Sequence, residues 1–303
     1  MAGDISAERV STSAELVGCS LEQRERIDRY YRESQFDYNV IWRTNRNLGR
    51  HFGFGMAPGN RGGGHDAALE SANRHLADLA EVGRDTRVID CGCGLGGTSI
   101  WLARERDAQV TGVDLLERQI ERARKEAARA QVSGKVRFLV GDFTATRLAG
   151  ESFDVVLAQE TLCHVERKER FYQEANRLLA PGGTIMIAEY MRLGRARSEH
   201  EERAMRSWCD GWIMPDLLTA QEHRAAARAA GFSRVEIFDG TARVSASLER
   251  LYRRAVYSFP IHQLLRSVGL RTDAQHGNIT AARLQFQLLK QGIWFYGLLH
   301  ARK

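Results

Sequence analysis

The chain has 303 residues, of which 43% are hydrophobic and 27% are charged, and its net charge is +6. This size predicts one large core with a smaller appendage and excludes two large domains. No apolar run approaches the roughly 18 residues of a membrane span, and residues 1–20 lack an apolar leader, so we expect a cytoplasmic protein without a membrane span.

The five cysteines and the arginine-rich composition exclude further classes. The cysteines are odd in number and lack the paired spacing of zinc ligands, which predicts reduced thiols and no metal site. Only five of the 44 basic residues are lysines, and the arginines are spread along the whole chain, so no nucleic-acid partner is expected. A small anionic substrate is compatible with the basic balance.

Residues 1–65 are predicted to form a helical and aromatic cap. Ser20-Leu21-Glu22-Gln23 has the form of a capping box, which predicts a helix to about Ser34. The segment from Tyr30 to Phe54 is dense in aromatic residues, namely Tyr30, Tyr31, Phe36, Tyr38, Trp42, Phe52 and Phe54. The glycine-rich stretch 53–64 then predicts a loop that hinges the cap to a main domain over 66–303.

Helices and strands alternate from residue 65 onward. A helix is predicted over 65–79, and strands are predicted over 87–90, 109–114, 136–141, 153–159 and 184–189. Further helices are predicted at 98–105, 117–130 and 169–179, with a turn at 181–183. This alternation implies βαβ units and a doubly wound, mostly parallel α/β sheet.

The last third of the chain completes the sheet and adds helices. Strands at 234–238 and 293–300 bring the predicted sheet to seven strands, and a helix is predicted at 220–230. Two helical blocks, at about 198–218 and 247–268, would be lids over the carboxyl edge of the sheet, where ligands of such folds bind.

A glycine-rich turn follows the first strand of this sheet. It reads Asp90-Cys91-Gly92-Cys93-Gly94-Leu95-Gly96-Gly97, and Asp114 ends the next strand. Glycines without a Cβ let the backbone approach a nucleoside, and the carboxylate can accept hydrogen bonds from both ribose hydroxyls. The turn by itself fits a nicotinamide cofactor as well as a sulfonium nucleoside.

Three downstream segments distinguish these cofactors: Gly141-Asp142-Phe143, Ala158-Gln159-Glu160-Thr161 and Pro181-Gly182-Gly183. With the glycine turn, in order and spacing over about 66–189, they resemble the class I S-adenosylmethionine-dependent methyltransferases. The resemblance implies a Rossmann-like fold and S-adenosyl-L-methionine as cofactor. It assigns cofactor binding to Asp90, Gly92, Gly94, Gly96, Asp114, Leu115, Gln119, Asp142, Phe143 and Gln159. Within this set, Asp142 would accept a hydrogen bond from the adenine amino group, and Asp90 would lie near the cofactor ammonium.

Shorter segments point to the methyl acceptor. Asp37-Tyr38-Asn39 to Trp42, His51-Phe52-Gly53-Phe54 and Glu160-Thr161-Leu162-Cys163-His164 are similar to segments of sterol, tocopherol and related isoprenoid C-methyltransferases. The similarity implies C-methylation of an isoprenoid or terpenoid small molecule in secondary metabolism, through a carbocation. Such a cation is stabilised by aromatic faces, so we expect Tyr30, Tyr31, Trp42, Phe52 and Phe54 to line its pocket. Packing between cap and core is the alternative role for each ring.

Polar residues of the same segments are candidates for catalysis and substrate binding. Glu160 is the first candidate for removing the proton from the cation, and His164 is the second. Arg50 and His51, together with Arg43 and Arg46, would hold a diphosphate if the substrate carries one.

Two other functions remain open on the sequence. One is O- or N-methylation of a small metabolite, with His164 or Glu160 as the base. The other is a non-catalytic cofactor-binding or RNA-binding member of the fold, against which the intact glycine and aspartate set speaks. The N-terminal arm is expected to fold over the site or to reach a neighbouring subunit of a homo-oligomer.

Overall fold

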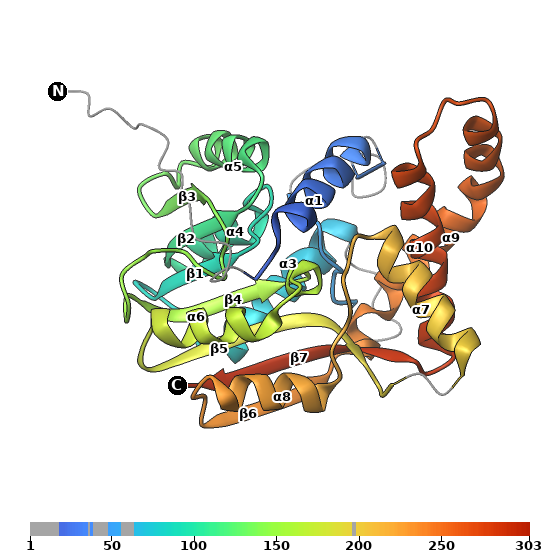
Figure 1. The fold of residues 1–303 in the computed structure, drawn as a ribbon. Coiled ribbons are helices and arrows are strands. Elements are labelled where there is room, and N and C mark those ends of the chain that lie inside the picture. The colour runs from blue at the N-terminus through green and yellow to red at the C-terminus, as the bar shows by residue number, and fades with distance from the viewer. Residues whose placement is uncertain (1–17, 36, 39–47, 56–63, 196–197) are drawn as a thin grey trace.

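The computed structural model describes residues 18–35, 37–38, 48–55, 64–195 and 198–303. In this part of the chain, seven strands form one sheet in the order β3-β2-β1-β4-β5-β7-β6 (Figure 1). The strands are β1 (Arg87–Cys91), β2 (Gln109–Asp114), β3 (Val136–Val140), β4 (Phe153–Gln159), β5 (Leu179–Arg192), β6 (Arg234–Asp239) and β7 (Trp294–Arg302).

The pairing of the strands confirms the expected doubly wound, mostly parallel sheet. The first five strands pair in parallel, whereas β7 runs antiparallel to both β5 and β6. The strand order reverses between β1 and β4, and ligands of open α/β sheets bind outside the carboxyl ends of the strands at such a point. Parallel pairing therefore brings the glycine turn, Asp114 and Gln159 to one edge of the sheet.

Helices cover both faces of the sheet. They are α1 (Leu21–Glu33), α3 (His65–Leu79), α4 (Gly97–Arg106), α5 (Glu117–Arg129), the short 3-10 helix η1 (Leu162–His164), α6 (Lys168–Leu178), α7 (Glu199–Gly211), α8 (Ala220–Ala229), α9 (Thr241–Ser267) and α10 (Asp273–Lys290). Apolar side chains of α3, α4 and α5 belong to one hydrophobic cluster, and those of α6 and α8 belong to a second. No described helix combines the length and the apolar character that crossing a membrane requires.

The lid region differs from the expectation by one helix. α7 and α9 lie within or across the two expected helical blocks, although α9 begins earlier, at Thr241, and residues 212–218 are not helical. The helix α10 was not expected, and it packs against both α7 and α9. A Cβ on Gly211 of α7 would lie 2.6 Å from the carbonyl oxygen of Gly277 in α10, so Gly211 allows the helices to approach. Gly277, inside α10, lowers the helix propensity of its segment.

The cap begins with half of the expected capping box. Ser20 Oγ accepts a hydrogen bond from the Gln23 backbone N–H (3.1 Å), as predicted for the start of α1. The reciprocal bond is absent, because Gln23 Nε2 donates to the carbonyl oxygens of His164 (3.2 Å) and Ile213 (2.9 Å). Ser20 N–H donates to Glu166 instead (2.6 Å). The residues that suggested a local cap thus attach α1 to η1.

One smaller expectation is corrected, at the start of β5. The turn expected at 181–183 belongs to the elongated β5, where Gly182 has a φ of +78° and the pairing with β4 is irregular between Phe153 and Val155. The five cysteines are all buried and form no disulfide. Most of the glycine-rich hinge, together with Trp42, Arg43 and Arg46, lies outside the described residues.

Candidate active site

Two adjoining cavities lie at the carboxyl ends of β1, β2 and β4. The first is lined by the glycine turn, the residues after β2 and the segment 48–51. The second is lined by residues of the cap, η1, β5 and the lids, namely Tyr38, Cys163, Tyr190, Trp212, Met214, Leu251, Asn278 and Ala282. Four residues line both cavities: Tyr31, Arg50, Glu160 and His164.

Close packing explains two glycines of the turn. Gly92 has a φ of +73°, and a Cβ there would lie 1.9 Å from Thr161 Oγ1. A Cβ on Gly97 would lie 2.6 Å from the backbone nitrogen of Gly49. Real Cβ atoms do not make contacts this short, so the glycines let the residues after β4 and the cap close over the turn. Gly92 and Gly94 line the first cavity, whereas Gly96 lies behind it against Phe138.

Asp114 is oriented by two backbone amides at the wall of the first cavity. Its oxygens accept hydrogen bonds from the N–H groups of Gly94 (3.0 Å) and Leu116 (2.9 Å). Burial raises the pKa of Asp114 above its ordinary value, and the two amides act against this rise. Each carboxylate oxygen keeps a lone pair for a hydroxyl donor. Leu115 and Gln119 line the same cavity.

Asp90 and Gln159 add polar groups at the ends of β1 and β4. Asp90 accepts a hydrogen bond from Ser99 Oγ (2.5 Å), and burial raises the pKa of Asp90 to about 6. Gln159 Oε1 accepts a hydrogen bond from Thr98 Oγ1 (3.2 Å), while its buried Nε2 has no partner among the described residues. Because buried amide groups are normally paired, this Nε2 fits a bound acceptor group in the cavity.

Asp142 does not line the first cavity, although its neighbour Phe143 does. The Asp142 carboxylate accepts hydrogen bonds from the N–H and Oγ1 of Thr144 and from Arg24 of α1 (2.8 Å). The Arg24 contact is an ion pair that attaches the cap to the main domain. The role of Asp142 toward adenine stays a prediction.

Glu160 stands between the two cavities. It has a φ of +50°, which is uncommon for a residue with a side chain. One carboxylate oxygen accepts hydrogen bonds from Phe52 N–H (2.7 Å) and Tyr296 Oη (2.8 Å), and the other from Tyr190 Oη (2.7 Å). Burial nevertheless raises the pKa of Glu160 to about 7. The carboxyl group is therefore held in place and changes its charge near neutral pH.

His164 is neutral and has a defined tautomer. Burial lowers the pKa of its imidazole to about 4. Its Nδ1 lies 3.3 Å from the carbonyl oxygen of Ile213, which can only accept, so Nδ1 carries the proton. Its Nε2, 3.3 Å from Tyr31 Oη, then accepts a hydrogen bond from that hydroxyl.

The aromatic residues expected at the substrate pocket separate into two groups. Tyr31 lines both cavities, and Tyr30 lies behind the second one, where its hydroxyl donates to Asn278 (2.9 Å). Phe52 and Phe54 are each 1% exposed and pack in the hydrophobic core. The structure thus places these two phenylalanines behind the cavity walls, which is the packing alternative raised by the sequence.

Other aromatic residues take the place of Phe52 and Phe54 in the second cavity. Tyr38, Tyr190 and Trp212 line it together with Tyr31. Tyr190 directly follows the strand predicted over 184–189, so its position at the carboxyl edge was a usable signal. Trp212 comes from the lid region, and no local pattern marks it as a cavity residue.

The basic residues expected to hold a diphosphate also lie in different places. Arg50 lines both cavities, its guanidinium carbon lies 5.2 Å from the centre of the Tyr38 ring, and burial lowers its pKa. Of the two cavities, His51 lines only the first, and its Nδ1 lies 3.1 Å from the Phe52 carbonyl oxygen. Burial lowers the pKa of His51 to about 4, so this imidazole is neutral.

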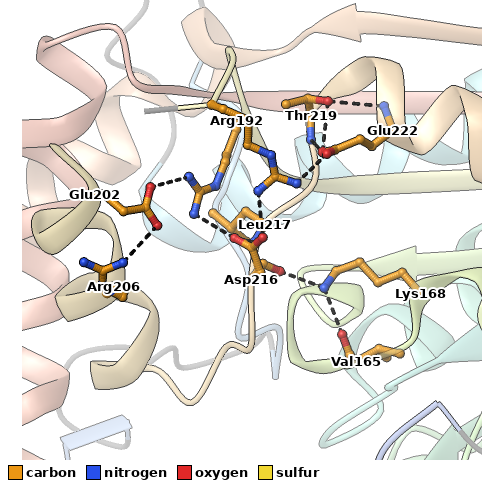
Figure 2. A network of polar contacts seen from close by, with 10 residues as sticks. Val165, Lys168, Arg192, Glu202, Arg206, Asp216, Leu217, Thr219 and Glu222 are labelled. Atoms are coloured by element: carbon orange, nitrogen blue, oxygen red, sulfur yellow. Dashed lines mark hydrogen bonds and ion pairs between the residues drawn. The ribbon is translucent and has the colours of Figure 1, made fainter. Parts of the chain in front are cut away.

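A polar network supports the lid residues 212–217. Figure 2 shows Asp216 between Arg192, which binds its carboxylate at 2.7 Å, and Lys168, which donates to its carbonyl oxygen at 2.7 Å. Lys168 Nζ also donates to the carbonyl oxygen of Val165 (2.8 Å), just after η1. The network therefore holds the lid against the segment that carries His164. Within the lid, Ile213 has a φ of +55°, which is strained for a β-branched residue.

Comparison with known proteins gives the family of the central region. Residues 83–230 match the model of the methyltransferase domain. The sterol 24-C-methyltransferase erg-4 of Neurospora crassa is 33% identical over 170 residues, which cover 55% of this chain and 45% of that protein. Ajmaline N-methyltransferase of Rauvolfia serpentina is 32% identical over 190 residues, covering 58% of this chain and 65% of that protein. The chain thus spans 45% of the length of the first relative and 65% of the length of the second.

Solved structures share the fold over nearly the whole chain. The cyclase SpnF superposes with a TM-score of 0.74 at 20% identity, covering 92% of this chain and 96% of SpnF. Geranyl diphosphate C-methyltransferase from Streptomyces coelicolor, in complex with Mg2+, geranyl diphosphate and S-adenosyl-L-homocysteine, superposes with a TM-score of 0.67 at 19% identity. That alignment covers 92% of this chain and 97% of the other. At such identities the likeness shows the fold, and the expected Rossmann-like architecture is confirmed.

Proposed function

We propose that this chain, an S-adenosylmethionine-dependent methyltransferase with its methyltransferase domain over residues 83–230, methylates an alkene carbon of an isoprenoid small molecule. One observation carries the proposal: the Glu160 carboxylate lies on the wall shared by two cavities, next to a cavity lined by four aromatic rings. The similarity to a sterol C-methyltransferase and to the geranyl diphosphate C-methyltransferase fold supports it.

The first cavity suits S-adenosylmethionine, which supplies an electrophilic methyl group when bound. Asp114 offers two oriented carboxylate oxygens to a ribose diol, and the unpartnered Nε2 of Gln159 offers a donor to a carboxylate. Burial raises the pKa of Asp90 to about 6, so the ammonium group of a cofactor bound beside it would favour the ionised carboxylate. Together, these two carboxylates and one amide donor match a nucleoside that carries a vicinal diol, an ammonium group and a carboxylate.

The second cavity suits an acceptor that becomes positively charged. The π-electrons of an alkene form the new carbon–carbon bond, the sulfur–methyl bond breaks, and a carbocation remains on the acceptor. The faces of Tyr31, Tyr38, Tyr190 and Trp212 attract such a cation through their quadrupoles, each by about 0.5–2 kcal/mol in a dry site. No base is required before the transfer, because the alkene is itself the nucleophile.

Glu160 completes the reaction by accepting a proton from a carbon next to the cationic centre. The carbon–hydrogen bond breaks, its electron pair restores an alkene, and Glu160 becomes neutral. A pKa of about 7 suits this step, since the carboxylate is populated at neutral pH and is more basic than an exposed carboxylate. The hydroxyls of Tyr190 and Tyr296 hold the carboxyl group in either charge state.

Arg50 is the described residue best placed to meet a diphosphate, because it is a cation on the wall of both cavities. Its planar guanidinium is suited to bidentate contacts with phosphate oxygens. A prenyl diphosphate is accordingly the first acceptor to test, before an uncharged terpenoid.

The second candidate is O- or N-methylation of a small metabolite. The Nε2 lone pair of the neutral His164 accepts a hydrogen bond from the Tyr31 hydroxyl at the shared wall, and a hydroxyl or ammonium substrate that takes the place of this hydroxyl would give its proton to Nε2. The relative named as an N-methyltransferase supports this alternative.

A methyl-labelling screen separates the candidates. The full chain is incubated with methyl-labelled S-adenosylmethionine and either prenyl diphosphates, uncharged terpenoid alkenes, or matched alcohols and amines. We expect label on carbon in an alkene acceptor. Label on oxygen or nitrogen alone would overturn C-methylation, and the absence of both label and S-adenosylhomocysteine binding would overturn the cofactor assignment itself.

A further inference from the structure

The C-terminal half of α9 exposes a continuous apolar stripe, which we define as Tyr257, Ile261, Leu264 and Val268. These side chains are 80%, 62%, 64% and 60% exposed, respectively. Their spacing of four, three and four residues places them on one face of the helix. Leu270, 72% exposed, continues the apolar surface just beyond the helix end.

This clustering is unusual within the described part of the chain. Nine large hydrophobic residues are strongly exposed there, and six of them lie between Val256 and Leu270. Isolated exposed apolar residues need no explanation, but a contiguous patch marks an interaction surface. Figure 1 shows that α9 and α10 project beside the sheet and are not enclosed by it. The stripe is therefore accessible to a large partner.

The charges of the same segment have one sign. Residues 250–272 contain five arginines and no aspartate or glutamate, although Arg266 pairs with Asp273 just beyond this segment and Arg271 forms a buried pair with Asp37. Arg253 lies one helical turn before Tyr257, on the face that carries the stripe. Its partner is Glu249, in an exposed ion pair, and such a pair exchanges readily for another anion. An apolar face that continues into arginines is typical of helices that lie in the interface of anionic lipids.

We propose that this surface of α9 docks on an anionic lipid bilayer, with the apolar stripe inserted and Arg253 at the level of the lipid phosphates. A second copy of the chain fits this surface less well. In a twofold contact the stripe would meet either itself or the arginines of its partner, and Glu249, which already pairs with Arg253, is the one carboxylate in line with the stripe. The docked helix lies on the bilayer and does not cross it.

The docking surface and the proposed active site share the helix α9. Leu251, two turns before the stripe on the same helix, lines the second cavity. Docking through α9 would therefore bring the helix that lines this cavity to a bilayer in which a lipophilic acceptor dissolves. This consequence for acceptor supply rests on the proposed function, whereas docking itself does not.

Vesicle binding of the full chain, without substrate or cofactor, tests the proposal. Vesicles of phosphatidylcholine with about 30% phosphatidylglycerol are compared by co-sedimentation with vesicles of phosphatidylcholine alone. We expect stronger binding to the anionic vesicles, and weaker binding as salt rises from about 0.1 M to about 0.5 M. Tyr257→Ser, Ile261→Ser and Leu264→Ser together should weaken binding at least about tenfold.

Matched variants keep the outcome interpretable. Leu193→Ser with Phe238→Ser removes two exposed apolar side chains elsewhere and should leave vesicle binding unchanged. Absence of binding to anionic vesicles, or equal binding of the triple variant, would overturn the proposal. A wild-type dimer that the triple variant converts to monomer, without vesicle binding by either, would assign the surface to a second copy instead. None of these measurements depends on methyl transfer, so their failure is distinct from failure of the proposed activity.

Discussion

Replacing Glu160 by glutamine removes the carboxylate from the wall between the cavities and keeps its shape. The amide oxygen of glutamine can still accept hydrogen bonds from Phe52 and Tyr296, and its amide nitrogen can donate to the rotatable hydroxyl of Tyr190. The site should therefore stay folded. A positioned base contributes about 10²–10⁴-fold to a rate, so turnover on an alkene acceptor should fall by about that factor.

The pH dependence of wild-type turnover provides a second quantitative test. Only the ionised carboxylate accepts a proton, and burial raises the pKa of Glu160 to about 7. Turnover should therefore rise about tenfold per pH unit below pH 7 and level off above it. The variant should lose this dependence and retain its affinity for S-adenosylhomocysteine.

Stability checks the same pKa without catalysis. A folded pKa raised from 4.5 to about 7 favours the protonated carboxyl, so the wild type loses stability as pH rises through this window. The shift corresponds to about 3 kcal/mol, an upper limit because the cavities admit water to the residue. Glutamine does not ionise, so the variant should gain in relative stability between pH 5 and about 8 in thermal unfolding.

Glu189 supplies a matched control. It is also buried, burial also raises its pKa to about 7, and it lines neither cavity. Its carboxylate accepts hydrogen bonds from the backbone N–H groups of Cys163 (2.8 Å) and Tyr190 (2.8 Å). Glu189→Gln should show the same rise in relative stability with pH, from a lower starting level because its amide nitrogen would face one of these N–H donors, and a loss of turnover below about tenfold. Equal losses of turnover in the two variants, or full turnover of Glu160→Gln, would refute the base assignment.

Three other substitutions test separate parts of the site. Asp114→Asn should weaken S-adenosylhomocysteine binding about 10–100-fold by calorimetry, because a charged acceptor of two hydroxyls is lost; unchanged affinity would remove Asp114 from the cofactor site. Lys168→Met should raise KM for the acceptor about 3–10-fold without changing cofactor affinity, since the loss of the ammonium group frees the lid from η1 (Figure 2). Arg206→Met, at an exposed residue, is the control, and an equal rise of KM in both variants would contradict a positioning role for Lys168. Arg50→Met should raise KM for a prenyl diphosphate by about tenfold or more and leave an uncharged terpenoid unaffected; parallel changes for both acceptors would argue against a phosphate contact.

Local patterns predicted the strands, most helices and the glycine turn. The alternation of apolar and polar residues needs only neighbours along the chain, and the carboxyl ends of parallel strands necessarily meet at one edge. That is why the amino-acid sequence alone assigns Asp90, Asp114, Gln159 and Glu160 to one region of the fold. The family model confirms the methyltransferase domain, and the individual roles of these residues stay predictions.

The residues that line the second cavity are determined by packing between distant segments. Phe52 and Phe54 belong to an aromatic cluster of the kind expected, yet both are buried in the core, while Tyr190 and Trp212 take the wall. An aromatic side chain packs equally well in a core or at a cavity, and its sequence neighbours do not distinguish the two. Only the approach of β5 and the lid helices does so.

Local periodicity and parallel pairing were enough to define the sheet, the glycine turn and the carboxylates at its edge, and the sequence contains both. Tertiary contacts alone decided that α10 exists as a partner of α7, that Gln23 attaches the cap to η1, and that Glu160 lies between two cavities. Each of these depends on contacts between residues far apart in the chain. Burial by such contacts is also what raises the pKa of Glu160 to about 7, and no pattern near residue 160 encodes it.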